Sequence, residues 1–143
     1  EERARIRAKV DGKDAGQALN EILIVPEKSG RMLEADVKIG NETRREAGDG
    51  LIVATPTGST AHALSAGGPI VRGNAPVFVT VSLNPAKWNH RPLVINEREK
   101  ISISSFGKIG AEAVVDGRIW HKIKSTVEIE KGSSVLLVVR KKQ

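Results

Sequence analysis

The chain has 143 residues, and its 23 Lys and Arg outnumber its 17 Asp and Glu, which gives a formal net charge of +6. Apolar residues make up 39% and charged residues 28%, a globular composition that excludes disordered and collagen-like chains. Cysteine is absent, which excludes disulfides, thiolate catalysis and cysteine-ligated zinc. No apolar run approaches the roughly 18 residues of a membrane span, and the first residues alternate like a strand, so we expect no membrane segment and no leader.

The excess of positive charge would suit an anionic partner, either nucleic acid or a phosphorylated small molecule. The basic residues are scattered, apart from Arg140-Lys141-Lys142 near the end of the chain. Surfaces that bind nucleic acid combine a basic stripe with aromatic side chains that stack on bases. Because the aromatic residues are only Phe78, Trp88, Phe106 and Trp120, we expect no nucleic-acid partner, whereas a small phosphorylated ligand stays open.

Ten segments have strand patterns, and in chain order they cover residues 6–10, 22–25, 33–39, 51–54, 77–83, 101–103, 113–115, 119–123, 127–129 and 135–139. Most alternate apolar and polar residues, which is typical of strands that bury one face. Four are continuous apolar runs and predict more deeply buried strands: 22–25, 51–54, 77–83 and 135–139. Turns are expected at Asp11-Gly12, Gly40-Asn41 and Asp116-Gly117, and the last of these predicts a hairpin.

Only two segments have helical character. Residues 14–19 form one turn or no helix, whereas residues 59–66 contain good helix formers and stop at Gly67-Gly68-Pro69, a strong terminator. About ten short strands and one short helix predict a mainly β protein, an antiparallel two-sheet β-sandwich. No linker or internal repeat divides the chain, so we expect residues 1–143 to form a single domain.

The segment from Gly48 to His62 carries the chemistry of the sequence. An apolar strand runs into Thr55-Pro56-Thr57-Gly58-Ser59-Thr60, where a helix is expected to begin, so backbone N–H groups would face a ligand at the helix N-terminus. No lysine follows Gly58 and the spacing is not that of a Walker A loop, which argues against a triphosphate. The three hydroxyls of the turn suit a polar heterocycle or a ribose. The alternative is that Thr57 or Ser59 only caps the helix.

This segment resembles the signature of ATP-dependent NAD kinases. The family's usual form is Asp-Gly, a short apolar strand, Thr-Pro-Thr-Gly-Ser-Thr-Ala-Tyr and then Ser-Leu-Ser-Ala-Gly-Gly-Pro. Here the match begins at Asp49-Gly50 and continues through Leu64-Ser65-Ala66-Gly67-Gly68-Pro69. Two shorter motifs agree in order and spacing: Asn20-Glu21 resembles the family's Asn-Glu/Asp pair, and Arg91-Pro92-Leu93-Val94 its Arg-Pro-Leu-Val stretch.

The resemblance is to half of such an enzyme. Full NAD kinases begin with an α/β domain that carries Gly-Gly-Asp-Gly, whose aspartate is expected to activate the ribose 2′-hydroxyl. Ala47-Gly48-Asp49-Gly50 lacks the first glycine and belongs to the later signature. The resemblance therefore implies a C-terminal NAD-binding domain that contributes no catalytic residue of its own. In the full, cytoplasmic enzyme, ATP with a divalent metal such as Mg²⁺ would phosphorylate NAD to NADP.

By this resemblance, Asn20 and Glu21 hold the ribose and phosphate region of NAD. An amide both donates and accepts hydrogen bonds, and a carboxylate accepts from a pair of ribose hydroxyls. The alternative is a turn-forming Asn beside a solvated Glu. The residues expected around the adenine have small or hydroxylated side chains: Thr57, Thr60, Ala61 and Ser65.

Four further residues are implied by position. His62 stands where the family usually has Tyr, and its imidazole can still stack and hydrogen-bond, which would make binding sensitive to pH. Asp49 falls at a position that in the family touches the nicotinamide end, often across a subunit interface. Arg31 falls near a family contact to the ligand, and Arg118 at a polar nicotinamide-side position. The alternatives are a surface histidine, an ordinary turn aspartate and solvated arginines. No metal site is expected, since no His-x-x-x-His pair occurs.

A rival hypothesis is a non-catalytic module for ligand binding and assembly, because the family's β domains also carry oligomer contacts and exposed sandwich edges pair readily. Lipid kinases of the same superfamily do not usually carry the long signature so closely. The resemblance implies a homo-oligomer that binds NAD, NADP and ATP with the help of the missing N-terminal domain. It leaves open whether ATP or polyphosphate is the donor and whether NAD or NADH is preferred.

Overall fold

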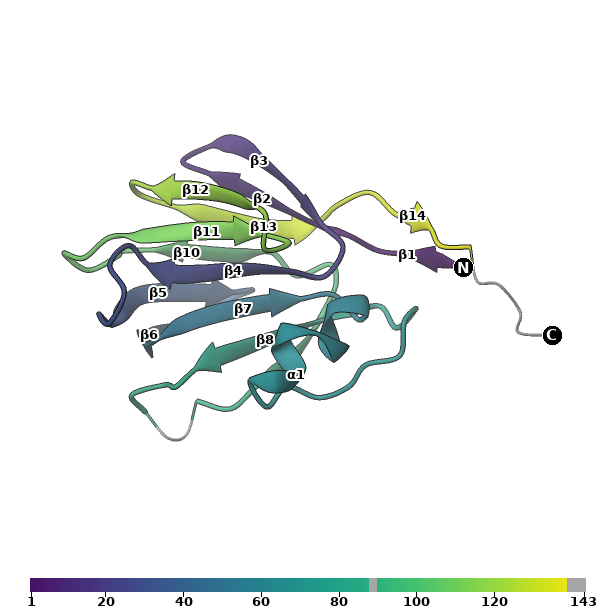
Figure 1. Ribbon diagram of the computed structural model, residues 1–143, viewed down its shortest axis with the longest axis horizontal. Helices are drawn as coiled ribbons and strands as arrows, with labels where there is room; N and C mark the ends of the chain where they lie inside the picture. The colour runs from purple at the N-terminus through teal and green to yellow at the C-terminus, as the bar shows by residue number, and fades with distance from the viewer. Residues whose placement is uncertain (88–89, 139–143) are drawn as a thin grey trace.

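The structure, a computed structural model, describes residues 1–87 and 90–138 and contains two six-stranded antiparallel sheets (Figure 1). Sheet I has the spatial order β3 (Lys13–Ala18), β2 (Ile6–Val10), β13 (Val127–Lys131), β10 (Ile101–Ser104), β5 (Leu33–Ile39) and β6 (Glu42–Gly48). Sheet II has the order β12 (Ile119–Ile123), β11 (Ala111–Val115), β4 (Glu21–Pro26), β7 (Gly50–Ala54), β8 (Val77–Leu83) and β9 (Leu93–Asn96). The predicted mainly β, two-sheet sandwich is confirmed.

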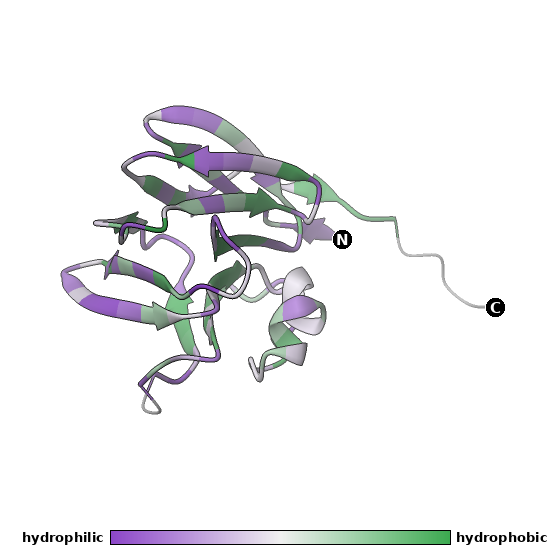
Figure 2. Cartoon of the chain, turned by 60° about the vertical axis from the view of Figure 1, so that its left-hand side comes forward, coloured by the Kyte–Doolittle hydropathy of each residue, from purple (hydrophilic) through white to green (hydrophobic). Residues whose placement is uncertain are grey.

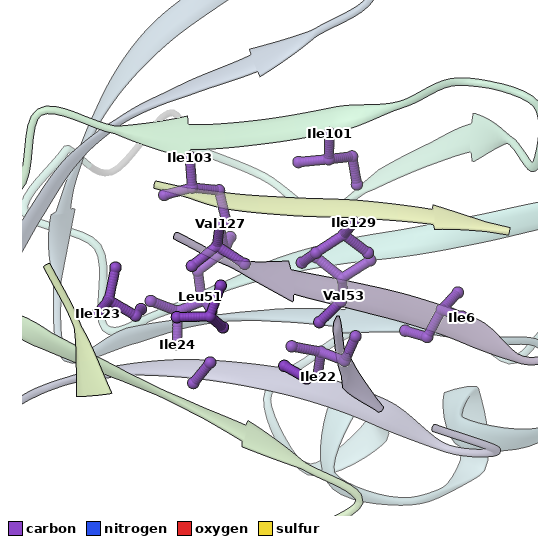
Figure 3. Close-up of a cluster of buried hydrophobic side chains, with 14 of the residues drawn as sticks. Ile6, Ile22, Ile24, Leu51, Val53, Ile101, Ile103, Ile123, Val127 and Ile129 are labelled. Atoms are coloured by element: carbon purple, nitrogen blue, oxygen red, sulfur yellow. The ribbon is translucent and has the colours of Figure 1, made fainter. Parts of the chain in front are cut away.

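The main core lies between the two sheets, where alternating side chains meet face to face. Figure 3 shows isoleucines and valines of β10 and β13 above Ile22 and Ile24 of β4 and Leu51 and Val53 of β7. The alternation of hydrophilic and hydrophobic residues along the strands is visible in Figure 2. Each fully buried aliphatic side chain contributes about 1.5–3 kcal/mol relative to an exposed one, so this cluster supplies most of the folding free energy.

Sheet II is also covered on its outer face. A 3₁₀ turn, η1 (Thr57–Thr60), and a short helix, α1 (His62–Ser65), lie against β7 and β8 (Figure 1). They enclose a second apolar cluster of Ile52, Ala54, Ala63, Val79 and Val81. Because β7 and β8 are packed on both faces, their sequences are continuous apolar runs, as predicted.

The predicted turns at the β2–β3 and β11–β12 connections are confirmed. Asp11 and Gly12 have φ angles of 51° and 81°, and Asp116 and Gly117 have 49° and 68°. Positive φ at both central residues is the geometry of the tight turns whose twist matches that of antiparallel strands.

Of the two alternatives for residues 14–19, one helical turn or no helix, the second is confirmed: residues 14–18 belong to strand β3, which buries Ala15 and Ala18 in the main core. Three other expectations were wrong. The single helix over 59–66 is divided into η1 and α1 at Ala61, whose φ and ψ of −101° and −126° are not helical. The run 135–139 is not deeply buried: only β14 (Val135–Leu136) forms, paired with β1 (Glu2–Arg3), and Leu136 is 79% exposed. Val139 lies outside the described residues, as do Trp88 and the basic run Arg140–Lys142.

The third wrong expectation is the strand count. All ten predicted strands exist, but β1, β3, β6 and β9 were not predicted. β6 is paired with β5 along its whole length although it carries two arginines and two glutamates. Among the described residues, no helix is long and apolar enough to cross a membrane.

Candidate functional site

The turn that follows β7 is organised by the hydroxyl of Thr55, which is fully buried. This hydroxyl donates to the backbone oxygen of Leu19 and accepts the N–H of Gly58 at 3.1 Å. The N–H of Thr55 donates to the backbone oxygen of Asn20 at 2.9 Å. Thr55 therefore joins the turn of the long signature to the segment that leads into β4.

Ser59 has a structural role. Its buried hydroxyl donates to the oxygen of Pro56 at 2.6 Å and accepts the N–H of Val71 at 2.9 Å, so it is not available to a ligand. Pro56 occupies the cap position and no side chain caps the turn, so the cap by Thr57 or Ser59 is wrong. The N–H groups of Gly58 and Ser59 bond within the turn, so they do not form the predicted binding site at a helix N-terminus.

The segment that leads into β4 is fixed from two sides. The carboxylate of Asp116 accepts the N–H groups of Leu19, Asn20 and Glu21 at 2.7, 2.8 and 3.2 Å. From the other side Gly58 packs so closely that a Cβ on it would overlap the carbonyl group of Asn20. Within the described residues the side chains of Asn20 and Glu21 make no hydrogen bond to another residue, which leaves an amide and a carboxylate available on a rigid backbone.

The carboxyl group of Glu21 is influenced by two other titratable groups. Burial raises the pKa of the Glu21 carboxyl, and the nearby carboxylate of Asp116 raises it further. The imidazole of His62, at the first position of α1, opposes these effects and favours the ionised carboxylate, as does a backbone hydrogen bond. The ionisation of Glu21 therefore depends on groups from two distant parts of the chain, Asp116 and His62.

The other residues expected around the ligand lie along η1 and α1. Thr57 is half-buried, whereas Thr60, Ala61 and Ser65 are exposed. The hydroxyl of Thr60 donates to the oxygen of Thr57 at 3.3 Å and keeps its lone pairs for another donor. Ser65 lines a hollow of about 390 Å³ together with Asp49.

Asp49 connects two hollows at the opposite end of β7. It precedes the first residue of β7, and its carboxylate accepts a hydrogen bond from the side-chain amide of Asn84 at 2.9 Å. It lines the hollow beside Ser65 and also a second hollow of about 480 Å³, which contains Arg31 and Trp120. The structure thus brings Asp49, Arg31 and Ser65 into neighbouring hollows.

The strand register explains how the residues are distributed. Glu21 at the start of β4 pairs with Ala54 at the end of β7, so Asn20, Glu21 and the signature turn share one end of sheet II. Asp49 and Arg31 flank the other ends of the same two strands. The six residues of β4 span about 17 Å, and α1 lies on the outer face between these ends.

Two expected features lie away from this arrangement. Arg118 is exposed in the β11–β12 turn, beside Asp116, and therefore lies at the Asn20 end of sheet II rather than with Arg31 and Asp49. Arg91-Pro92-Leu93-Val94 leads into β9, the edge strand of sheet II beyond β8. No group of three or more His, Asp or Glu side chains that could hold a metal ion occurs in residues 1–87 and 90–138.

Sequence reasoning missed Thr55 and Asp116, which fix the Asn20 segment. Asp116 was interpreted only as a turn residue, although an Asp in the left-handed conformation can direct its carboxylate at backbone N–H groups. Trp120 was also missed. Its signal was an indole on a short edge strand in a chain with only four aromatic residues.

The family described as the ATP-NAD kinase C-terminal domain matches residues 19–141. The chain belongs to this family. It is 37% identical over 141 residues to a NAD kinase of Methanopyrus kandleri, covering 98% of this chain and 51% of that protein. It is 41% identical over 142 residues to a NAD kinase of Methanospirillum hungatei, a match that covers 97% of this chain and 53% of that protein.

Solved structures of the NAD kinase family agree with the fold. Yeast NADH kinase complexed with NADH has a TM-score of 0.83 and 28% identity, over 93% of this chain and 41% of that one. A NAD kinase from Archaeoglobus fulgidus in complex with ATP has a TM-score of 0.81 and 30% identity, and the match covers 92% of this chain and 52% of that one. The chain therefore spans about half the length of the NAD kinases that it matches.

Proposed function

We propose that this chain is the NAD-binding half of an NAD kinase, in which ATP phosphorylates the adenosine ribose 2′-hydroxyl of NAD to give NADP and ADP. One observation carries the proposal: Gly58 of the long signature packs directly on Asn20 of the second motif, at the open end of sheet II. The names of the relatives, which are NAD kinases, support the same reaction.

In this proposal the chain positions NAD and does not itself react. The amide of Asn20 and the carboxylate of Glu21 hold the ribose, while Thr57, Thr60 and Ala61 contact the adenine and Ser65 completes the pocket. His62 favours the ionised form of Glu21, which is the form that accepts hydrogen bonds from ribose hydroxyls. Phosphoryl transfer depends on positioning, and a misplacement of about 1 Å can cost on the order of 10²-fold in rate.

ATP and the divalent metal belong to the part of the enzyme that carries Gly-Gly-Asp-Gly. The described residues do not fit a metal ion, because no three acidic or imidazole side chains gather. We therefore assign neither the metal nor the catalytic aspartate to residues 1–143, which act as one domain, and we place the full enzyme in the cytoplasm on the same family grounds. Arg31 and Asp49 are proposed as contacts to the nicotinamide-bearing half of NAD, whereas Arg118, which lies at the Asn20 end of sheet II, does not share their hollow and is not assigned to that half.

A second candidate function is assembly. β9 is an edge strand of sheet II, and its Leu93 and Val94 are exposed, which favours pairing with another copy of the chain. We propose that the enzyme is a homo-oligomer built through this domain. Sedimentation of the parent chain and of Val94→Lys tests it: the variant should shift to a smaller species, and an unchanged distribution would exclude this edge.

The experiment that tests the proposed function is a calorimetric titration of the purified chain with NAD, with an activity assay in ATP and Mg²⁺ in parallel. We expect binding without turnover. Asn20→Ala and Thr60→Val should each weaken binding by about three- to tenfold, the value of one lost hydrogen bond. Thr43→Val, which removes an exposed hydroxyl from β6 of sheet I, is the matched control and should bind NAD like the parent chain.

Each alternative has a distinct result. No binding at millimolar NAD would favour the assembly module. Turnover by the chain alone would place the catalytic residue within residues 1–143. If Asn20→Ala and Thr60→Val lose melting temperature in proportion to affinity, both residues are structural.

A further inference from the structure

Trp120 continues a row of apolar side chains on the outer face of sheet II. The register places Trp120 opposite Val114, Val114 opposite Leu23, and Leu23 opposite Ile52. Residues directly opposite one another in antiparallel strands project to the same face. Glu21 projects there too, two positions before Leu23 on β4. Trp120 therefore shares a surface with the Asn20–Glu21 end of the site.

The indole is left largely uncovered. Trp120 is 60% exposed, whereas Val114 beside it is 2% exposed. Tryptophan is well buried on average, so this indole offers an unusually large apolar surface to a ligand. The indole borders the hollow of about 480 Å³ formed with Val25 and Pro26, the loop of residues 29–31 and Asp49.

The chemistry of this hollow favours a flat ring that carries positive charge. An indole face stacks on planar aromatic rings, and its quadrupole attracts a cation. The carboxylate of Asp49 and the guanidinium of Arg31 both line this hollow and carry opposite charges, so they contribute little net charge to it. The electrostatic preference of the hollow is then set mainly by the face of Trp120.

We propose that Trp120 stacks on the positively charged pyridinium ring of NAD and thereby favours NAD over NADH, whose dihydropyridine ring is neutral. This inference rests on the proposed function, because the adenosine half of the same molecule lies near Asn20 and Thr60. Asp49 borders both the hollow of Trp120 and that of Ser65, so one extended dinucleotide can reach both. Trp120 is a specificity-determining residue for the oxidation state of the ring.

The test compares three ligands: NAD, NADH and ADP-ribose, which lacks the ring. The parent chain should bind NAD about three- to tenfold more tightly than NADH, the range of a cation–π contact. Trp120→Ala should lower NAD affinity about tenfold, the cost of one lost stacking contact. It should remove the preference over NADH and leave ADP-ribose binding within about twofold. Trp120→Phe should keep part of the preference.

Ile119→Ala is the matched control. Ile119 is 48% exposed on the same strand and projects to the opposite face, so its removal should change none of the three affinities. Fluorescence gives a second reading, because a pyridinium ring quenches a stacked indole. The chain has two tryptophans, so in Trp88→Phe the emission comes from Trp120, and NAD but not ADP-ribose should quench it.

The outcomes separate this inference from the proposed function. If Trp120→Ala weakens ADP-ribose as much as NAD, or changes neither, the stacking role is wrong while NAD binding stands. If Trp120→Ala dissociates an oligomer without changing NAD affinity, Trp120 is a subunit contact and the inference fails. If the parent chain binds neither NAD nor ADP-ribose, both proposals fail.

Discussion

For Gly58→Ala, local helix propensity predicts a gain in stability, whereas the observed packing predicts a loss. Gly58 lies inside η1, where replacing glycine by alanine would ordinarily stabilise a helical turn by about 0.5–1 kcal/mol. A Cβ at this position, however, would overlap the carbonyl group of Asn20 and lie 2.7 Å from its Cα. Both partners are backbone, so no flexible side chain can move away.

We therefore expect Gly58→Ala to lower the free energy of unfolding by about 2–3 kcal/mol, the range for overpacking a rigid contact. Displacement of Asn20 should also reduce NAD affinity by about tenfold, because its hydrogen bonds to the ligand are lost. Urea denaturation gives the stability, and calorimetric titration at a temperature where the variant is folded gives the affinity.

Gly117→Ala provides the comparison. A Cβ there meets nothing within 4 Å, but φ is +68°, so only the cost of the left-handed conformation, about 1 kcal/mol, should appear. NAD affinity should not change. If Gly58→Ala is instead as stable as the parent chain and binds NAD equally well, the close packing of the signature turn on Asn20 is wrong.

Three further predictions concern carboxylates. Asparagine suits the same left-handed turn as Asp116, but in Asp116→Asn it offers a weaker acceptor to the three N–H groups. Urea denaturation should therefore show a free energy of unfolding lower by about 1–3 kcal/mol, and titration a weaker affinity for NAD. Unchanged values would show that the carboxylate does not fix this segment. Desolvation alone would raise the pKa of Asp11, but hydrogen bonds from the backbone of Lys124, Ser125 and Thr126 outweigh it and lower the pKa from 3.8 to about 2. Its stabilising contribution, about 1–2 kcal/mol after solvent screening, is therefore complete above pH 4 and lost as the pH falls toward 2, and Asp11→Asn should remove that part of the pH dependence in thermal melts; a melt with the parent's slope would contradict this. The pKa of Glu21 is raised overall, and His62 acts against this rise, so NAD affinity should fall as the pH is lowered and Glu21 becomes protonated. In His62→Gln this fall should begin at a higher pH, which titrations with NAD at several pH values would show. Identical pH profiles for the variant and the parent chain would mean that His62 does not affect the ionisation of Glu21.

The sequence predicted the fold class because most strands bury one face and so alternate visibly. β6 was not predicted because it buries a charged residue, Glu46, whose partners come both from β6 itself and from distant segments. Glu46 of β6 is 4% exposed, yet its carboxylate lies 2.6 Å from the guanidinium of Arg44, accepts the hydroxyl of Ser82 at 2.8 Å and lies 3.4 Å from the imidazole of His90. A buried charge whose partners include residues far along the chain, such as Ser82 and His90, cannot be recognised from local periodicity.

The candidate site was also predictable only in part. Asn20 and the signature turn were paired by resemblance, and the structure places them in backbone contact. The division of the helix at Ala61 and the internal role of Ser59 were not predictable, because both arise from packing on β7 and on the loop at Val71. Asp116 acts on backbone groups up to 97 positions away, which no local pattern reports.

The most direct test of the central claim, that NAD lies on the outer face of sheet II between Asn20 and α1, is to map amide chemical shifts of the labelled chain during titration with NAD. We expect saturable shifts at residues 20–21 and 57–65, with smaller changes at Asp49 and none on the outer face of sheet I. Shifts confined to sheet I, or none at millimolar NAD, would contradict the claim.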